Sequence, residues 1–197
     1  MELKNANIVI LAKNHNPSIV SKEWLTQRKI VEEKVDKFSH SPLFSLVETA
    51  SLALVLDPDR LQVSLKNASL STLELLPKLT EKYVCNLPET PYTAIGFNFL
   101  FQMASMVDSI KKLFKPDDKK FSELFSADYQ VGGNISYKFD GFFAKVALLP
   151  VDDGSILADL NFHFNCKGTE DIKIALKKYD STIKKSTDIL TGLFKNV

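Results

Sequence analysis

One stretch near the middle of the chain, residues 92–102, constrains the fold more than any other. Its sequence reads YTAIGFNFLFQ, and large apolar side chains occupy every second position, at Ile95, Phe97, Phe99 and Phe101. Successive side chains of a β-strand point to opposite faces, so these four share one face of a sheet. The chain must therefore build a sheet with one buried face, and this strand belongs in its interior.

Before this stretch we predict a strand, a helix, three strands and a second helix. The first strand covers residues 7–12, and a helix begins at Ser21, whose hydroxyl can accept hydrogen bonds from the first turn. The three strands cover residues 43–49, 52–56 and 61–66. Leucines at helical spacing predict a helix within residues 70–87, where Pro77 marks a kink or a helix start.

The second half repeats this order. The strand at residues 92–102 precedes a helix that Pro116 ends, with a short helical continuation through Phe125. Three strands follow, at residues 129–139, 142–148 and 156–164. A long helix then begins at Gly168-Thr169 and runs to the carboxyl end, with acidic residues at its positive pole.

These elements predict a single α+β domain over residues 1–197, with pseudo-halves of about 1–90 and 91–197, each of the order β-α-β-β-β-α. Two such halves would merge into one large, mostly antiparallel sheet with helices packed on one face. In element order alone, the chain resembles the duplicated saddle of the TATA-box-binding-protein fold, or a helix-grip fold with its long last helix. The amino acids do not repeat between the halves, so an internal duplication is a hypothesis. A shared element order implies a fold and not an activity.

Composition narrows the possible partners and the compartment. Lys and Arg number 25 against 24 Asp and Glu, and only Arg28 and Arg60 are arginines. Because arginine makes the bidentate contacts to phosphate and guanine, we disfavour a nucleic-acid partner. No segment has the apolar length of a membrane span, and the amino terminus has no signal-peptide pattern. We expect a cytoplasmic protein without a membrane partner.

The sequence contains no motif typical of catalysis, a cofactor or a metal. His15, His40 and His163 have no histidine, cysteine or carboxylate at ligand spacing, and Cys85 and Cys166 lie too far apart to indicate a zinc site. The pair Gly132-Gly133 belongs to no phosphate-binding pattern, and there is no nucleophile-elbow motif. We therefore predict no catalytic, cofactor-binding or metal-ligating residues.

The second faces of the predicted strands are polar but rarely charged. Their side chains form a candidate interaction face: Asn98, Gln102, Gln130, Asn134, Ser136, Asn161, His163 and Asn165, with Gln62 and Ser64 in the first half. A surface that meets only water would more often carry lysine and glutamate. Neutral amides suit a surface that meets another surface.

Two hypotheses of function follow. The first is a non-enzymatic binding or assembly module that uses this polar open face or a sheet edge to associate with a protein partner or with a second copy. The alternative is a binder of small apolar ligands, or an enzyme, with its pocket between the long C-terminal helix and the sheet. The 14 phenylalanines would suit such a cavity, and they would equally suit a packed core.

Overall fold

A nine-stranded antiparallel sheet runs through the protein, in a computed structural model that describes residues 1–104, 107–125 and 129–195. In chain order its strands are β1 (Glu2–Ala12), β2 (Lys37–Ser41), β3 (Phe44–Glu48), β4 (Leu52–Leu56), β5 (Arg60–Leu65), β6 (Tyr92–Met103), β7 (Gly133–Phe139), β8 (Phe142–Pro150) and β9 (Ile156–Asn165). They lie in the order β2-β3-β4-β5-β1-β6-β9-β8-β7. The predicted fold, an α+β domain with one large antiparallel sheet, is confirmed.

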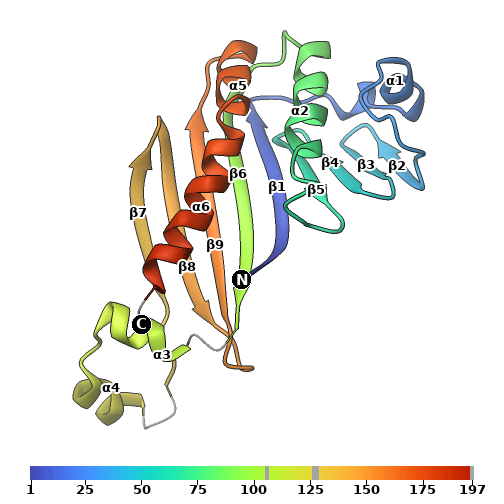
Figure 1. Cartoon of the computed structure of the whole chain (residues 1–197). Helices are drawn as coiled ribbons and strands as arrows, with labels where there is room; N and C mark the ends of the chain where they lie inside the picture. The colour runs from blue at the N-terminus through green and yellow to red at the C-terminus, as the bar shows by residue number, and fades with distance from the viewer. Residues whose placement is uncertain (105–106, 126–128, 196–197) are drawn as a thin grey trace.

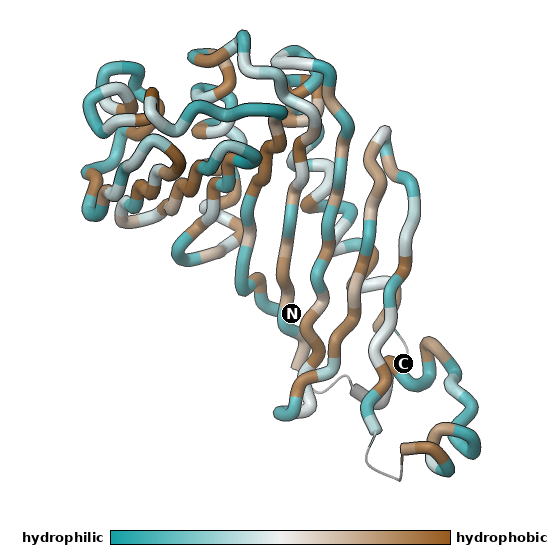
Figure 2. The backbone as a smooth tube through the Cα atoms, turned by 180° about the vertical axis from the view of Figure 1, so that it is seen from behind, coloured by the Kyte–Doolittle hydropathy of each residue, from teal (hydrophilic) through white to brown (hydrophobic). Residues whose placement is uncertain are grey.

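Most of the helices lie on one face of this sheet, and two lie beyond one of its ends. They are the short 3-10 helix η1 (Pro17–Ile19), then α1 (Lys22–Gln27), α2 (Leu75–Asn86), α3 (Val107–Phe114), α4 (Asp118–Phe125), α5 (Thr169–Leu176) and α6 (Tyr179–Leu193). Figure 1 shows α2, α5 and α6 lying over the central strands, with α3 and α4 beyond one end of the sheet. Seen from behind in Figure 2, the central strands have no helix in front of them. None of the helices in the described segments has both the length and the apolar composition that a membrane crossing needs.

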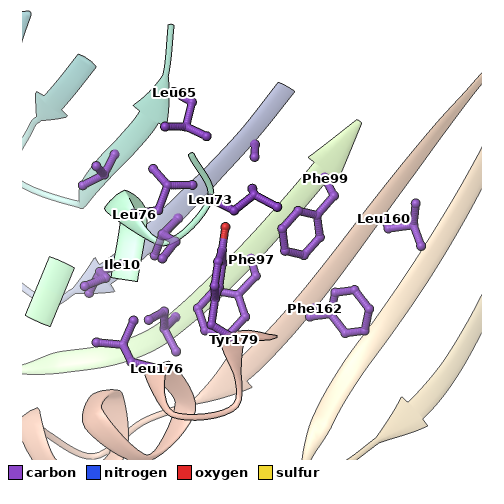
Figure 3. Packing of buried hydrophobic residues seen from close by; sticks show 14 of the residues in the cluster. Ile10, Leu65, Leu73, Leu76, Phe97, Phe99, Leu160, Phe162, Leu176 and Tyr179 are labelled. Carbon is purple, nitrogen blue, oxygen red and sulfur yellow. The ribbon is translucent and has the colours of Figure 1, made fainter. Parts of the chain in front are cut away.

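The strand predicted at residues 92–102 is β6, and it lies in the middle of the sheet between β1 and β9. Phe97, Phe99 and Phe101 are at most 2% exposed. The ring of Tyr179, at the start of α6, lies 5.0 Å from that of Phe97 and 5.6 Å from that of Phe99, centroid to centroid. Figure 3 shows these rings together between the helix and the sheet. Aromatic burial of this kind explains why β6 anchors the helices.

Local signals explain several element boundaries. The Ser21 hydroxyl accepts a hydrogen bond from the Trp24 amide at 3.1 Å, which caps α1 as predicted. Asp57 Oδ1 accepts hydrogen bonds from the amides of Asp59 and Arg60, each at 2.9 Å, and so closes the turn between β4 and β5. Pro77 lies in the first turn of α2, where its missing N–H leaves no intrahelical bond unmade.

The structure differs from the predicted elements in four places, one of which is the start of β7 at Gly133 rather than at residue 129. The first half contains a fourth strand after its helix, β2, which pairs with β3 through a turn at Pro42-Leu43. Strand β1 starts at Glu2 rather than at residue 7. The long C-terminal helix is two helices, α5 and α6, which meet at Lys177-Lys178.

Candidate functional site

The uncovered face of the sheet carries one row of side chains that crosses all nine strands. In antiparallel pairing, residues directly opposite each other point to the same face. The register aligns Lys37, Glu48, Ala53, Ser64, Asn7, Asn98, Asn161, Lys145 and Ser136 in order from β2 to β7. We call the uncovered surface around this row the open face. The row is charged toward its ends and carries only neutral amides on the three central strands.

Hydrogen bonds join the central asparagines into one chain of side-chain amides. Asn98 Nδ2 donates to Asn7 Oδ1 at 2.8 Å, and Asn161 Nδ2 donates to Asn98 Oδ1. Asn7 Nδ2 in turn donates to Asn5 Oδ1 at 3.2 Å. We call these four residues the asparagine ladder. A side-chain amide has two N–H donors and two acceptor lone pairs, so each amide within the ladder keeps capacity for a partner.

The rows on either side of the ladder mix apolar and polar groups. On one side of the ladder, Gly96 lies opposite Val9, and His163 lies opposite Gly96. Phe143 lies opposite His163 and is 53% exposed. On the other side, Leu100 lies opposite Asp159. Partial burial raises the pKa of the Asp159 carboxyl, and nearby Lys145 counteracts part of this effect. The open face thus combines amides with apolar groups and few charges.

Two hollows lie in this surface. One is an open depression of about 320 Å³ over the ladder, lined by Asn5, Asn7, Val9, Gln62, Asn98, Leu100 and Asp159. The other, of about 530 Å³, lies over the β7–β9 strands and includes Ser136, Lys145, Asn161 and His163 in its lining. Both are shallow features of an open surface, so they suit side chains of another surface.

Seven of the eight predicted face residues lie on strands, and their register places them on the open face. Asn98, Asn161 and Ser136 share the central row, Asn134 and His163 lie in the rows next to it, and Asn165 and Gln102 lie one row further out. The His163 and Asn165 side chains are hydrogen-bonded, with Nε2 and Oδ1 3.0 Å apart. Gln102 Nε2 donates to the Ser155 hydroxyl at 3.1 Å. Gln130 is exposed but lies before β7, outside the strands.

The sequence interpretation missed the contribution of β1 to this face. Asn5 and Asn7 alternate with the buried Ala6 and Ile8, which is the signal that would have placed them there. The apolar run at residues 8–12 concealed it, because that run reads as a strand buried on both faces. Lys145 and Asp159 were also left out of the predicted face; each is the single charged residue of its strand.

The chemistry-bearing residues elsewhere do not converge. No group of three or more His, Cys, Asp or Glu within the described segments could hold a metal ion. His40 Nδ1 lies 2.8 Å from the Ser45 hydroxyl near the β2 edge, far along the sheet from His163 on β9. Cys166 is buried, and burial raises the pKa of its thiol to about 12, so this cysteine is a poor nucleophile.

The region between the C-terminal helix and the sheet is partly filled. Phe97, Phe99 and Tyr179 pack together under the start of α6. At the other end of α6, an open hollow of about 390 Å³ is lined by Met1, Met103, Ala104, Leu190, Thr191, Phe194 and Lys195. This is where the described residues leave room for an apolar molecule beside the helix.

No model of a known protein family matches the chain, and a search of curated proteins finds no match. The open face and its asparagine ladder therefore carry the functional argument.

Proposed function

We propose that this protein is a non-enzymatic binding or assembly module that associates with a protein through the open face of its sheet. The observation that carries the proposal is the asparagine ladder, which crosses β1, β6 and β9 at the centre of an uncovered surface. Asparagine is depleted from strands because it packs poorly on a pleated surface. Three asparagines side by side on adjacent interior strands should therefore lower the stability of the fold. Recognition of a partner would explain why they are present.

The chemistry of the face suits a protein surface. Spare amide donors and acceptors can pair with peptide groups or with polar side chains, without a buried charge to compensate. Val9, Leu100 and Phe143 next to the ladder supply apolar contact area, as the centre of a protein interface requires. An interface with this mixture gains specificity from its amides and affinity from its apolar groups.

Site-specific photo-cross-linking tests the proposal. A benzophenone amino acid replaces Gln62 on the open face and, in a matched control, Glu81 on the exposed side of α2. A discrete cross-linked protein is expected from position 62 and not from position 81. The captured protein is then purified, and its affinity is measured by calorimetry. Asn98→Lys should abolish binding, and Glu81→Lys should leave it unchanged.

Two outcomes would contradict the proposal. One is the absence of any product specific to position 62 in cells that make the protein. The other is equal affinity of the captured protein for the wild type and for Asn98→Lys, because the ladder would then contribute nothing.

A second candidate function is binding of a small apolar ligand. It rests on the hollow at the carboxyl end of α6, which Met103, Leu190 and Phe194 line. Fatty acids of graded length should then raise the melting temperature, and Leu190→Gln should remove the shift. An unchanged melting temperature with every ligand would rule out this candidate.

A further inference from the structure

The outermost strand of the second half, β7, has a free edge. It pairs with β8 on one side, and no described strand pairs with it on the other. Figure 1 shows this strand at the margin of the sheet, with α3 and α4 near its amino end and α6 over the neighbouring strands. An exposed edge presents a row of unpaired backbone donors and acceptors, which can pair with another strand.

The hairpin turn determines which backbone groups face outward. Asp140 and Gly141 have φ angles of 48° and 89°, as in a two-residue type I′ turn. In such a hairpin the residues that flank the turn, Phe139 and Phe142, form a hydrogen-bonded pair, and the pairs alternate along the ladder. The N–H and C=O groups of Asn134, Ser136 and Lys138 therefore point away from β8.

This edge carries few of the devices that usually prevent strand pairing. It contains no proline, and its one charged residue is Lys138. Lys138 Nζ lies 5.6 Å from the centroid of the Phe143 ring, so this side chain leans back over β8. The opposite edge strand, β2, has only five residues against seven in β7, and η1 packs beside it.

We propose that two copies of the chain join through β7, antiparallel, about a two-fold axis at Ser136. The two nine-stranded sheets then form one continuous sheet. This proposal goes beyond the proposed function, because it identifies a second copy of the chain as a partner and the edge of β7, rather than the open face, as the contact.

This register brings no like charges together on the open face. Ser136 lies opposite the partner's Ser136, and Asn134 lies opposite the partner's Lys138. No like charges meet, and about six backbone hydrogen bonds form, two for each of three pairs. It is also the one register in which all seven residues of β7 have a partner, because its two ends are equally far from Ser136.

Side-chain size is complementary on the helical face. Ile135 lies opposite the partner's Tyr137, and Gly133 lies opposite the partner's Phe139. The Phe114 ring lies directly over Gly133, where a Cβ atom would be 2.2 Å from its Cζ. Phe114 thus fills the space that the missing side chain leaves, and the partner's Phe139 would pack against its ring.

The dimer would extend the candidate site. Ser136 and Lys145 belong to the same cross-strand row as Asn161, so the row continues through the axis into the partner. Five strand spacings of about 4.8 Å separate Asn161 from the partner's Asn161, which is about 24 Å. The two ladders would face the same side and could bind one extended or two-fold symmetric protein.

Charge substitutions at the axis test the proposal without disturbing the monomer. In Ser136→Glu the new carboxylate lies opposite Lys145 of its own chain, which favours folding, and opposite its own copy across the axis, which opposes pairing. Sedimentation velocity should show reversible doubling of mass for the wild type in the micromolar range and a monomer for Ser136→Glu. An equimolar mixture of Ser136→Glu and Ser136→Lys should restore the dimer. Ser39→Glu on β2 is the matched control and should dimerise as the wild type does.

A cysteine at the axis provides a second, geometric test. The two Ser136 Cα atoms would be about 5.5 Å apart, which lies within the range of a disulfide. In a Cys85→Ser background, Ser136→Cys should form a disulfide-linked dimer on mild oxidation, and Ser39→Cys should not.

Three results would overturn the dimer: a wild type that stays monomeric at high concentration, a dimer that Ser136→Glu leaves intact, or equal cross-linking from positions 39 and 136. These results are separate from those for the proposed function. If position 62 cross-links a partner but the protein is monomeric, only the dimer is refuted. If the protein dimerises through β7 but position 62 cross-links no partner, only the open-face partner is refuted.

Discussion

At the scale of single residues, buried hydroxyl groups without partners are the clearest cost in the core. The Tyr179 hydroxyl has no hydrogen-bond partner among the described residues, and burial raises its pKa above the ordinary value. Tyr179→Phe keeps the ring contacts with Phe97 and Phe99 and removes the unpaired group. We expect the free energy of unfolding to rise by about 1 kcal/mol in urea titrations.

Tyr92→Phe is the matched control, because the Tyr92 hydroxyl donates to the Leu87 carbonyl at 3.1 Å. It should lower the free energy of unfolding by about 1 kcal/mol. A loss of stability in both variants would show that the Tyr179 hydroxyl has a partner in solution.

His15 makes the stability of the protein depend on pH. The side chain is 2% exposed, and its Nε2 lies 3.3 Å from the Ile10 carbonyl oxygen. Burial lowers its pKa, against the raising effects of that carbonyl, Asp57 and Asp59. The unfolded chain therefore binds the proton more readily, so stability is full above the unfolded pKa of about 6.5 and falls as the pH drops toward the folded value.

Chemical denaturation between about pH 7.5 and pH 5.5 measures this effect. Once the pH has fallen below the folded pKa, the wild type should have lost about 1.4 kcal/mol for each unit by which the His15 pKa is depressed. His15→Gln should be less stable at neutral pH and should lack this part of the slope. An identical slope in the two proteins would assign the pH dependence to other groups.

At the scale of secondary-structure elements, the asparagine ladder should trade stability for recognition. The triple variant Asn7→Thr, Asn98→Thr and Asn161→Thr places β-branched side chains opposite each other on three central strands. Threonine suits strands better than asparagine, so we expect the free energy of unfolding to rise by about 1 kcal/mol in total, measured by urea titration. Binding of the protein captured from the open face should fall in the same variant. A variant that is less stable than the wild type would give the ladder a structural role instead.

Some of the strands and helices could be predicted from the sequence, and others could not. Alternation of large apolar side chains identified β6 and β9, because every second residue of β6 and of β9 as far as Phe162 is buried. The sequence Lys37–Ser41 has only Phe38 as a large apolar group, so β2 was missed. The break between α5 and α6 carries neither glycine nor proline, and helical spacing continues through it.

Part of the candidate site could be predicted from the sequence, and the rest depends on how the strands pair with one another. Asn98 and Asn161 were recognised on their strands from the period of two alone. Their contact, and the contact of Asn98 with Asn7, join residues 63 and 91 positions apart in the chain. Only the pairing of β6 with β9 and with β1 specifies such contacts, and no local pattern encodes it.

At the scale of the whole molecule, the two halves of the chain share their connectivity. In each, the first strand lies at the centre, the last strand pairs with it, and the others follow outward to the edge. Matching connectivity agrees with an internal duplication, which stays a prediction because the amino acids do not repeat. The β7 dimer would add a two-fold axis between two copies of the chain.

The joint between the halves should make the protein one cooperative unit. Strands β1 and β6 form a ladder from Glu2 and Gln102 to Ala12 and Tyr92, and Ile8 and Ile10 on β1 lie opposite Phe97 and Ile95. All four of these side chains are fully buried. We therefore expect far-ultraviolet and near-ultraviolet circular dichroism to give superimposable urea transitions. Fragments 1–90 and 91–197 should each stay unfolded alone, since each would expose an apolar strand, and should regain the native spectrum when mixed. A cooperative transition in either isolated fragment would show that the halves are independent domains and that the β1–β6 ladder merely docks them.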